Sequence, residues 1–355
     1  MPAYKQSDGR HWLCKFYYKD FTGKRRQKMK RNFATKRDAL AYEDAFVTGN
    51  LSIEEEILQH VYDHYMEEVS EKFKPSTVNC KKNIFETKIL PFFGHKKIKD
   101  ITPAMIREWQ KTLEDDPTGL SKTYLNAINR QLNALMNHAT RYYNLPKNPC
   151  EHVAKMGSCS HAEVEFWTPE EYKAFRNATK NEPNAFVCFE TLYWTGIRAG
   201  EMLALTESDI NLEKNELSIN KTYQRLSGSE YITTPKTENS VRRVMLPPFL
   251  TEEIDIYMTY GDQPPDRYGR IFPFDDAWLC YRIHKYAKMA GVREIRVHSL
   301  RHSAASLLIN EGFDALEVSR RLGHKKVSTT LDTYSHLFPT KQDALVARLH
   351  ELGKD

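Results

Sequence analysis

Residues 298–336 read HSLRHSAASLLINEGFDALEVSRRLGHKKVSTTLDTYSH, and this stretch decides the fold and the chemistry that we expect of the chain. It contains His298 and Arg301 three residues apart and ends shortly after Tyr334. A second arginine, Arg198, lies well upstream in TGIRAG. Arginine presents a planar set of donors matched to phosphate oxygens and keeps its charge near neutral pH. These residues therefore suit attack by a tyrosine hydroxyl on a phosphodiester.

The same stretch predicts three short helices that would hold these residues. A helix that begins at His298 places His298 and Arg301 about one turn apart, where both can address a single phosphate near the unpaired amides of the helix start. A second helix ends at Gly323, whose left-handed cap leaves His324 in the turn that follows. The third helix carries Tyr334, ten residues after His324.

The order of these residues resembles the signature of the tyrosine recombinases, the family of phage integrases and Xer-type resolvases. Residues 195–205, TGIRAGEMLAL, are similar to the family's box around its first arginine. Lys236 lies in the segment TPKTENS between two predicted strands, and it is similar to the lysine that the family carries on a β-hairpin. The resemblance implies six catalytic residues, namely Arg198, Lys236, His298, Arg301, His324 and Tyr334.

The resemblance also implies a mechanism that needs no metal and no cofactor. Tyr334 attacks the scissile phosphate, and a 3'-phosphotyrosyl link forms as the 5'-hydroxyl leaves. The two arginines clamp the non-bridging oxygens, and His324 adds a hydrogen bond to them. Lys236 protonates the leaving oxygen, while His298 assists proton transfer at the phenol.

Four further residues accompany the six. Glu201 is expected to be a buried partner that orients the first arginine or a neighbouring group. His302, directly after the second arginine, is expected to contact the catalytic residues and not the substrate itself. Arg242 and Arg243 are the nearest alternatives to Lys236, but we expect them to contact the DNA backbone or to remain solvated.

A chain of 355 residues exceeds what one hydrophobic core usually organises. The predicted fold class is multidomain and mainly α with small antiparallel sheets: an N-terminal three-stranded β-sheet plus helix, a helical-bundle core-binding domain and an α+β tyrosine-recombinase catalytic domain. We expect an arm-type DNA-binding domain over 1–50, a helical core-site DNA-binding domain over 51–155 and the catalytic domain with a C-terminal docking segment over 164–355. Pro and Gly make residues 146–161 resemble a linker region, with 156–163 as the linker proper.

The N-terminal part is the most basic. Residues 1–50 hold 12 Lys and Arg against 5 Asp and Glu, although the net charge of the whole chain is only +5. Aromatic residues alternate with Lys and Arg on two predicted strands, a pattern suited to a β-ribbon that enters a DNA groove. The candidate DNA-binding residues here are Lys15, Lys19, Lys24, Arg25, Arg26, Lys28 and Lys30.

The region after residue 50 shows the apolar periodicity of four helices, the second of which is predicted to stop at Pro91. Most exposed Lys and Arg residues make no specific contact, so one or two of the basic residues here are expected to touch phosphates. The candidates are Lys81, Lys82, Lys122, Arg130 and Arg141.

The expected partner is double-stranded DNA at core and arm sites. The resemblance favours a homo-oligomer, a dimer to tetramer on DNA, with accessory DNA-bending or excision proteins as further partners. The segment 342–352 folds onto its own domain or docks on a neighbouring protomer, and the resemblance favours docking. The sequence shows no membrane-length apolar run, no secretory leader and no C-x-x-C pair, so we expect a prokaryotic cytoplasmic protein with reduced cysteines.

Two other functions use the same fold. A type IB topoisomerase shares the chemistry, but a separate basic N-terminal module favours the bridging of two DNA sites. A non-catalytic DNA-binding regulator derived from this fold would be expected to lack at least one of the six residues, and the sequence retains all of them.

Overall fold

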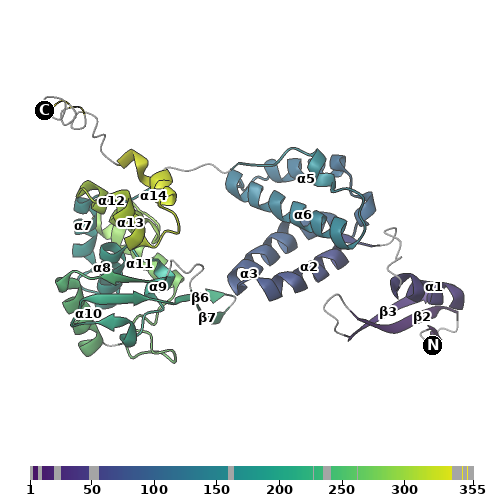
Figure 1. The fold of residues 1–355 in the computed structure, drawn as a ribbon, viewed down its shortest axis with the longest axis horizontal. Coiled ribbons are helices and arrows are strands. Elements are labelled where there is room, and N and C mark those ends of the chain that lie inside the picture. Colours follow the sequence, from purple (N-terminus) through teal and green to yellow (C-terminus); the bar gives the residue numbers. More distant parts are fainter. Residues whose placement is uncertain are drawn as a thin grey trace. The chain divides into compact units, whose positions relative to one another are not determined.

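The computed structural model describes residues 3–6, 10–19, 25–47, 56–158, 164–226, 228–234, 241–261 and 263–337, together with residues 346 and 350. The chain forms two compact units, Met1–His161 and Ala162–Asp355 (Figure 1). None of the helices in the described ranges is long and apolar enough to cross a membrane. Lys24 and Lys236, both named above, lie outside the described residues. Of the segment 342–352, the structure describes only residues 346 and 350.

The N-terminal part is a three-stranded antiparallel sheet in the order β1-β2-β3, covered by one helix. Its elements are β1 (Ala3–Lys5), β2 (Trp12–Lys19), β3 (Arg25–Phe33) and α1 (Lys36–Val47). The side chain of Thr35 accepts a hydrogen bond from the backbone N–H of Asp38 and so begins α1. Alternation along β2 turns Cys14 and Phe16 inward against Ala39 of the helix. The predicted sheet plus helix is confirmed.

The following part is a helical bundle. Its elements are α2 (Leu58–Lys72), α3 (Pro75–Ile84), η1 (Phe85–Ile89), α4 (Leu90–Phe93), η2 (Ile98–Asp100), α5 (Pro103–Glu114), α6 (Lys122–Tyr142) and η3 (Pro149–His152). Thr102 and Ser121 cap α5 and α6 through their side-chain oxygens. Apolar residues at helical spacing on α6, such as Leu125, Ile128 and Leu132, are fully or nearly fully buried in the core.

Two expectations for this bundle are wrong. The second helix does not stop at Pro91, because η1 is a π-helical turn in which the N–H of Leu90 bonds the carbonyl of Phe85. Proline cannot donate to the residue four positions before it, and the wider turn accommodates that loss. Residues 146–156 are not a linker, since η3 packs on α6 and Met156 is buried in the bundle core.

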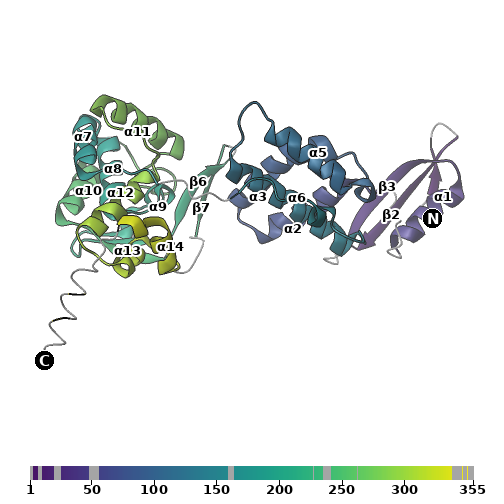
Figure 2. The same ribbon diagram turned by 90° about the horizontal axis from the view of Figure 1, so that it is seen from above.

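The second unit combines helices with two small sheets. Its helices are α7 (Pro169–Thr179), α8 (Pro183–Thr195), α9 (Ala199–Met202), η4 (Glu207–Asp209), α10 (Pro248–Tyr260), α11 (Asp276–Ala290), α12 (Ser299–Asn310), α13 (Ala315–Leu322), α14 (Val327–Tyr334) and η6 (Ser335–Leu337). Its strands are β4 (Ile210–Asn211), β5 (Glu216–Ile219), β6 (Thr222–Leu226), β7 (Ser229–Thr233) and β8 (Arg242–Met245). The apolar helix α8 packs against α7, α10 and α12, while α12, α13 and α14 lie side by side (Figures 1 and 2).

The strands differ from the predicted arrangement in one respect. β4, β5 and β8 form one antiparallel sheet, and β6 and β7 form a separate two-stranded ribbon. Within the described residues, the strands on either side of the segment that contains Lys236, β7 and β8, therefore belong to different sheets. The ribbon extends from the rest of this unit in both views (Figures 1 and 2).

Candidate active site

The turn between α8 and α9 places Arg198 at the site. Gly196 ends α8 with a left-handed backbone, φ 67°, and a Cβ atom there would lie 2.7 Å from Leu322 and 3.3 Å from Ala304. Only glycine therefore allows the end of α8 to approach α12 and α13 so closely. This close approach brings Arg198 and Arg301, which are distant in sequence, into the same cluster.

Glu201 lies beneath two arginines and binds both. Its Oε1 accepts from Nη1 of Arg198 at 2.7 Å, and its Oε2 accepts from Nη2 of Arg242 at 3.0 Å. Burial favours the protonated acid, but the Arg242 and Arg198 charges outweigh burial and hold the pKa of Glu201 below its usual value. Glu201 is thus the buried orienting partner that the sequence suggested, and it binds Arg242 as well.

Arg301 is the most informative side chain of the site. It is 3% exposed, and its Nη1 donates to the carbonyl of Gly196 at 2.8 Å. Its Nη2 is buried without a hydrogen-bond partner among the described residues. Burial, followed by the charge of Arg198, lowers the pKa of Arg301 to about 9, so the group remains charged at pH 7. A buried cation with an unsatisfied donor indicates a position for an anion.

Tyr334 is 1% exposed and lies next to His302. The phenol oxygen is 2.5 Å from Nδ1 of His302, and the rings of His302 and His298 meet at 5.1 Å. Burial raises the pKa of Tyr334 to about 12, although the charge of Arg301 opposes the shift. Burial, together with the charges of His298 and Arg301, lowers the pKa of His302 to about 4. The phenol is therefore protonated and the imidazole neutral at pH 7.

His324 follows Gly323, which caps α13 with φ 71° as predicted. Its Nδ1 is 2.8 Å from Oγ1 of Thr330, a fully buried residue of α14. Burial, then the charges of Arg301 and Arg198, lowers the pKa of His324 to about 4. His324 is therefore a neutral hydrogen-bonding group beside the two arginines.

The structure thus gathers five of the six predicted catalytic residues, and the sixth, Lys236, lies outside the described residues. His298 opens α12 with an exposed side chain, and its pKa is lowered by desolvation and by the charges of Arg301 and Arg198. Among the described residues, His302 and not His298 contacts the phenol of Tyr334. The sequence pattern did not indicate this hydrogen bond, because His298 at the start of α12 and His302 one turn later both lie near Arg301. The role of His298 in proton transfer stays a prediction.

Arg242 is not solvated, which was one of the two alternatives expected for it, and its contact with the DNA backbone stays a prediction. Its side chain is 8% exposed, binds Glu201 and donates through Nε to the carbonyl of Arg321 at 3.0 Å. Arg243 points to the opposite side of β8, with a side chain that is 74% exposed and 3.3 Å from Glu216. Alternation along a strand places one arginine inside and its neighbour outside.

The DNA-binding candidates of the first unit differ in exposure. Lys15 is exposed, whereas Lys30 lies over the ring of Tyr42 at 4.5 Å, and Lys81 donates to Tyr65 and Gln131. Exposed side chains also belong to Lys82, Lys122, Arg130 and Arg141. The side chains of Lys19, Arg25, Arg26 and Lys28, together with Lys24, are outside what the structure describes.

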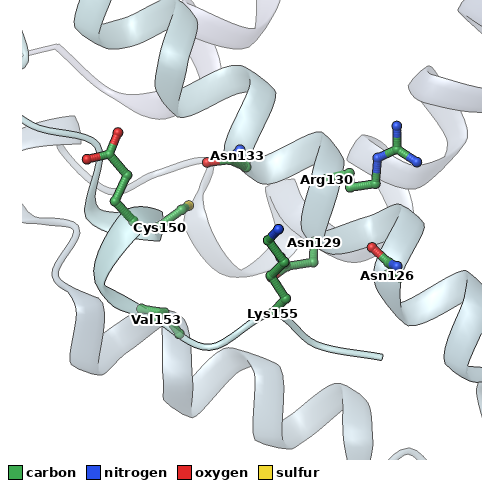
Figure 3. Close-up of a pocket in the computed structure, with 8 residues that line it drawn as sticks. Asn126, Asn129, Arg130, Asn133, Cys150, Val153 and Lys155 are labelled. Carbon is green, nitrogen blue, oxygen red and sulfur yellow. The ribbon is translucent and has the colours of Figure 1, made fainter. Parts of the chain in front are cut away.

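A cavity of about 540 Å³ lies beside α6 and η3 (Figure 3). It is lined by Asn126, Asn129, Arg130, Asn133, Cys150, Glu151, Val153 and Lys155. Two of the asparagines form hydrogen bonds with buried residues of the bundle: Asn129 accepts from Gln110 and Asn133 accepts from Asn148, each at 2.8 Å. Arg130 is an exposed cation at the edge of this cavity.

Comparison with known proteins agrees with this geometry. The phage integrase family matches residues 165–341, the N-terminal SAM-like domain of phage integrases matches 57–113, and an arm DNA-binding domain matches 2–48. The ICEBs1 integrase of Bacillus subtilis (strain 168) is 32% identical over 292 residues, which cover 79% of this chain and 78% of the relative.

Solved structures share the fold. The Tn1549 transposon integrase in complex with a circular intermediate DNA has a TM-score of 0.68 at 18% identity, covering 83% of this chain and 99% of that chain. A lambda integrase dimer bound to a COC' core site has a TM-score of 0.62 at 16% identity, covering 96% and 97%. The predicted fold class is confirmed. The chain belongs to the phage integrase family and is a tyrosine recombinase, a site-specific DNA recombinase of the kind that mobile elements carry.

Proposed function

We propose that the cluster around Arg301 binds the scissile phosphate of double-stranded DNA and that Tyr334 attacks it, forming a 3'-phosphotyrosyl link. The observation that carries this proposal is the buried Nη2 of Arg301, which has no partner among the described residues and lies with Arg198, His324 and Tyr334 in one electrostatic cluster. A non-bridging phosphate oxygen would satisfy this donor. Phosphodiesters carry one negative charge, which this positive cluster would stabilise.

The roles of the groups follow from what each can do. Arg198 is 40% exposed and would bind the phosphate from the open side, whereas Arg301 would bind from the buried side. Neutral His324 would donate a hydrogen bond from Nε2, because Thr330 occupies the Nδ1 side. Lys236 would protonate the 5'-oxygen as it leaves. Together these groups stabilise the charge that builds on the phosphate during in-line attack.

The proposed site uses no metal and no cofactor, because the guanidinium groups supply the positive charge that a metal supplies in other nucleases. The bond energy is retained in the phosphotyrosyl link, so a second hydroxyl can restore the phosphodiester. This reversible exchange distinguishes strand transfer from hydrolysis.

The rest of the chain would bring the site to its DNA. Residues 1–50 would bind arm sites, residues 51–156 would bind core sites, and residues 157–163 would join them to the catalytic domain, 164–355. We infer a dimer to tetramer on DNA in the cytoplasm of a prokaryotic cell, with accessory DNA-bending or excision proteins. The match to an arm DNA-binding domain over residues 2–48 supports the first assignment.

A nicked suicide substrate tests the proposal, because the nick lets the 5'-product diffuse away and traps the covalent intermediate. The wild-type chain should form an SDS-stable adduct with DNA, and Tyr334→Phe should bind the same DNA with unchanged affinity but form none. Tyr286→Phe, which alters a tyrosine outside the cluster on α11, should form the adduct normally. An adduct at normal yield from Tyr334→Phe would refute the assignment of the nucleophile.

A further inference from the structure

His302 lies within hydrogen-bonding distance of the reacting oxygen. Its Nδ1 is 2.5 Å from the phenol oxygen of Tyr334, and that oxygen has no other hydrogen-bond partner among the described residues. A buried hydroxyl donor is almost always satisfied. Tyr334, at 1% exposure, must therefore donate its proton to Nδ1, which leaves the proton of the neutral imidazole on Nε2.

We propose that His302 is the general base that accepts the proton of Tyr334 when the scissile phosphate is bound, an inference that rests on the proposed function. In this step the Oη–H bond of Tyr334 breaks and an Nδ1–H bond forms on His302, which becomes an imidazolium. The phenolate oxygen bonds to phosphorus as the bond to the 5'-oxygen breaks. In the reverse step the Nδ1 proton of His302 returns to the departing Tyr334.

The free site does not favour this transfer. Four groups face His302 among the described side chains, namely His298 directly before α12, Arg301 of α12, Tyr334 of α14, and His324 after α13. Burial and the cationic neighbours keep the imidazole neutral, and burial keeps the phenol protonated. With a pKa near 12, the phenol is ionised at pH 7 only about once in 10⁵ molecules.

A bound phosphate changes this balance at His302. Its negative charge offsets the charge of Arg301, so an imidazolium at His302 becomes less unfavourable. His302 would then become a stronger base only after DNA occupies the cluster. Because the nucleophile is ionised only where a phosphate is present, the free protein keeps Tyr334 protonated and unreactive.

His302→Asn tests the proposal because an amide oxygen can accept the hydrogen bond from Tyr334 but cannot take up its proton. Single-turnover adduct formation on the nicked substrate should fall by about 10²- to 10⁴-fold, the range typical of a lost general base, while DNA affinity stays the same. His284→Asn makes the same change at a half-exposed histidine of α11 and should leave the rate unchanged.

The pH profile separates a base from a structural contact. Without a base, cleavage depends on phenolate formed by solvent, so the rate of His302→Asn should rise about tenfold per pH unit between pH 6 and 9. The wild-type rate should instead level off above the pKa of DNA-bound His302. Replacing Tyr334 by a more acidic fluorotyrosine should reduce the deficit of His302→Asn at least tenfold, because an acidic phenol needs less help.

The results distinguish the two levels of the proposal. If the wild-type chain forms no adduct, or if Tyr334→Phe forms one, the proposed function itself fails. If the adduct depends on Tyr334 but His302→Asn keeps a wild-type rate and pH profile, His302 is not the base. A deficit that fluorination leaves unchanged would also overturn the inference. Should His302→Asn not fold, His302→Ala with added imidazole provides the same comparison, and no recovery of rate would count against the base.

Discussion

Replacing Arg242 by alanine should destabilise the catalytic domain far more than the same change at its neighbour, Arg243. Nη2 of Arg242 lies 3.0 Å from Oε2 of Glu201, and the two side chains are 8% and 3% exposed. Arg242→Ala leaves this buried carboxylate with Arg198 alone. The two arginines are adjacent on β8, so they share a backbone environment but differ in what their side chains contact.

The expected magnitude follows from the burial of the pair. Removing one partner of a buried ion pair costs about 3–5 kcal/mol, since an uncompensated charge remains. Glu201 keeps its contact with Arg198 at 2.7 Å, which favours the lower end, about 3 kcal/mol. Arg243 is 74% exposed and its pair with Glu216 is solvated, so its loss should cost about 0–1 kcal/mol.

Urea unfolding of the full chain, followed by hydrogen exchange of peptides from residues 164–337, measures both variants in the same domain. With a slope of about 2 kcal/mol per molar urea, Arg242→Ala should lower the midpoint by about 1.5 M, and Arg243→Ala by less than about 0.5 M. Equal midpoints for the two variants would refute the buried-pair reasoning.

The pH dependence gives a second check on the same pair. The folded-state pKa of Glu201 is depressed, so its charge contributes stability above the unfolded pKa of about 4.3, and this contribution is lost as the pH falls through the folded value. Arg242 is the strongest of the contacts that lower this pKa. The stability difference between wild type and Arg242→Ala should therefore be fully present at pH 7 and should narrow as the pH falls below about 4.3, and a difference that stays constant down to about pH 3 would contradict the assignment.

Two further predictions concern DNA. Deleting residues 1–46 should leave cleavage of a short core site intact but weaken the salt-dependent binding of arm DNA, measured by titration at two salt concentrations, and equal binding would contradict the arm assignment. Replacing the bridging 5'-oxygen by sulfur gives a leaving group that needs no proton, so Lys236→Ala should recover cleavage on that substrate and Arg198→Ala should not. Equal rescue of both variants would move the proton donor to another residue.

Local signals in the sequence predicted much of the fold. Thr168 and Glu171 form a capping box that begins α7, with Pro169 at the first helical position, and Gly196 and Gly323 end their helices in the left-handed conformation. Such signals depend only on residues within one turn, so they are readable from sequence. The six catalytic positions came from a resemblance in motif order and not from these local rules.

The sequence predictions failed where contacts between residues far apart in the sequence determine the structure. Strand alternation shows that Arg242 and Arg243 face opposite sides, but it does not show which side is inside. The contact with Glu201, 41 residues before Arg242, decides this. His298 precedes α12 and His302 lies in its first turns, and only the position of α14 shows which of them is hydrogen-bonded to the phenol. The π-turn before Pro91 likewise depends on packing that the proline signal does not contain.

The charges of the site explain why the free protein tolerates such a cluster. The carboxylate of Glu201 balances the positive charges of Arg198 and Arg242, so these two cations are stable in the site without a ligand. Among the described residues, Arg301 instead forms no ion pair and keeps one buried donor unsatisfied. A second carboxylate here would stabilise the free protein but would compete with phosphate for that donor. The free protein therefore keeps one buried donor without an anion, which lowers its stability. When a phosphodiester binds, it satisfies this donor, and the free energy gained contributes to DNA binding.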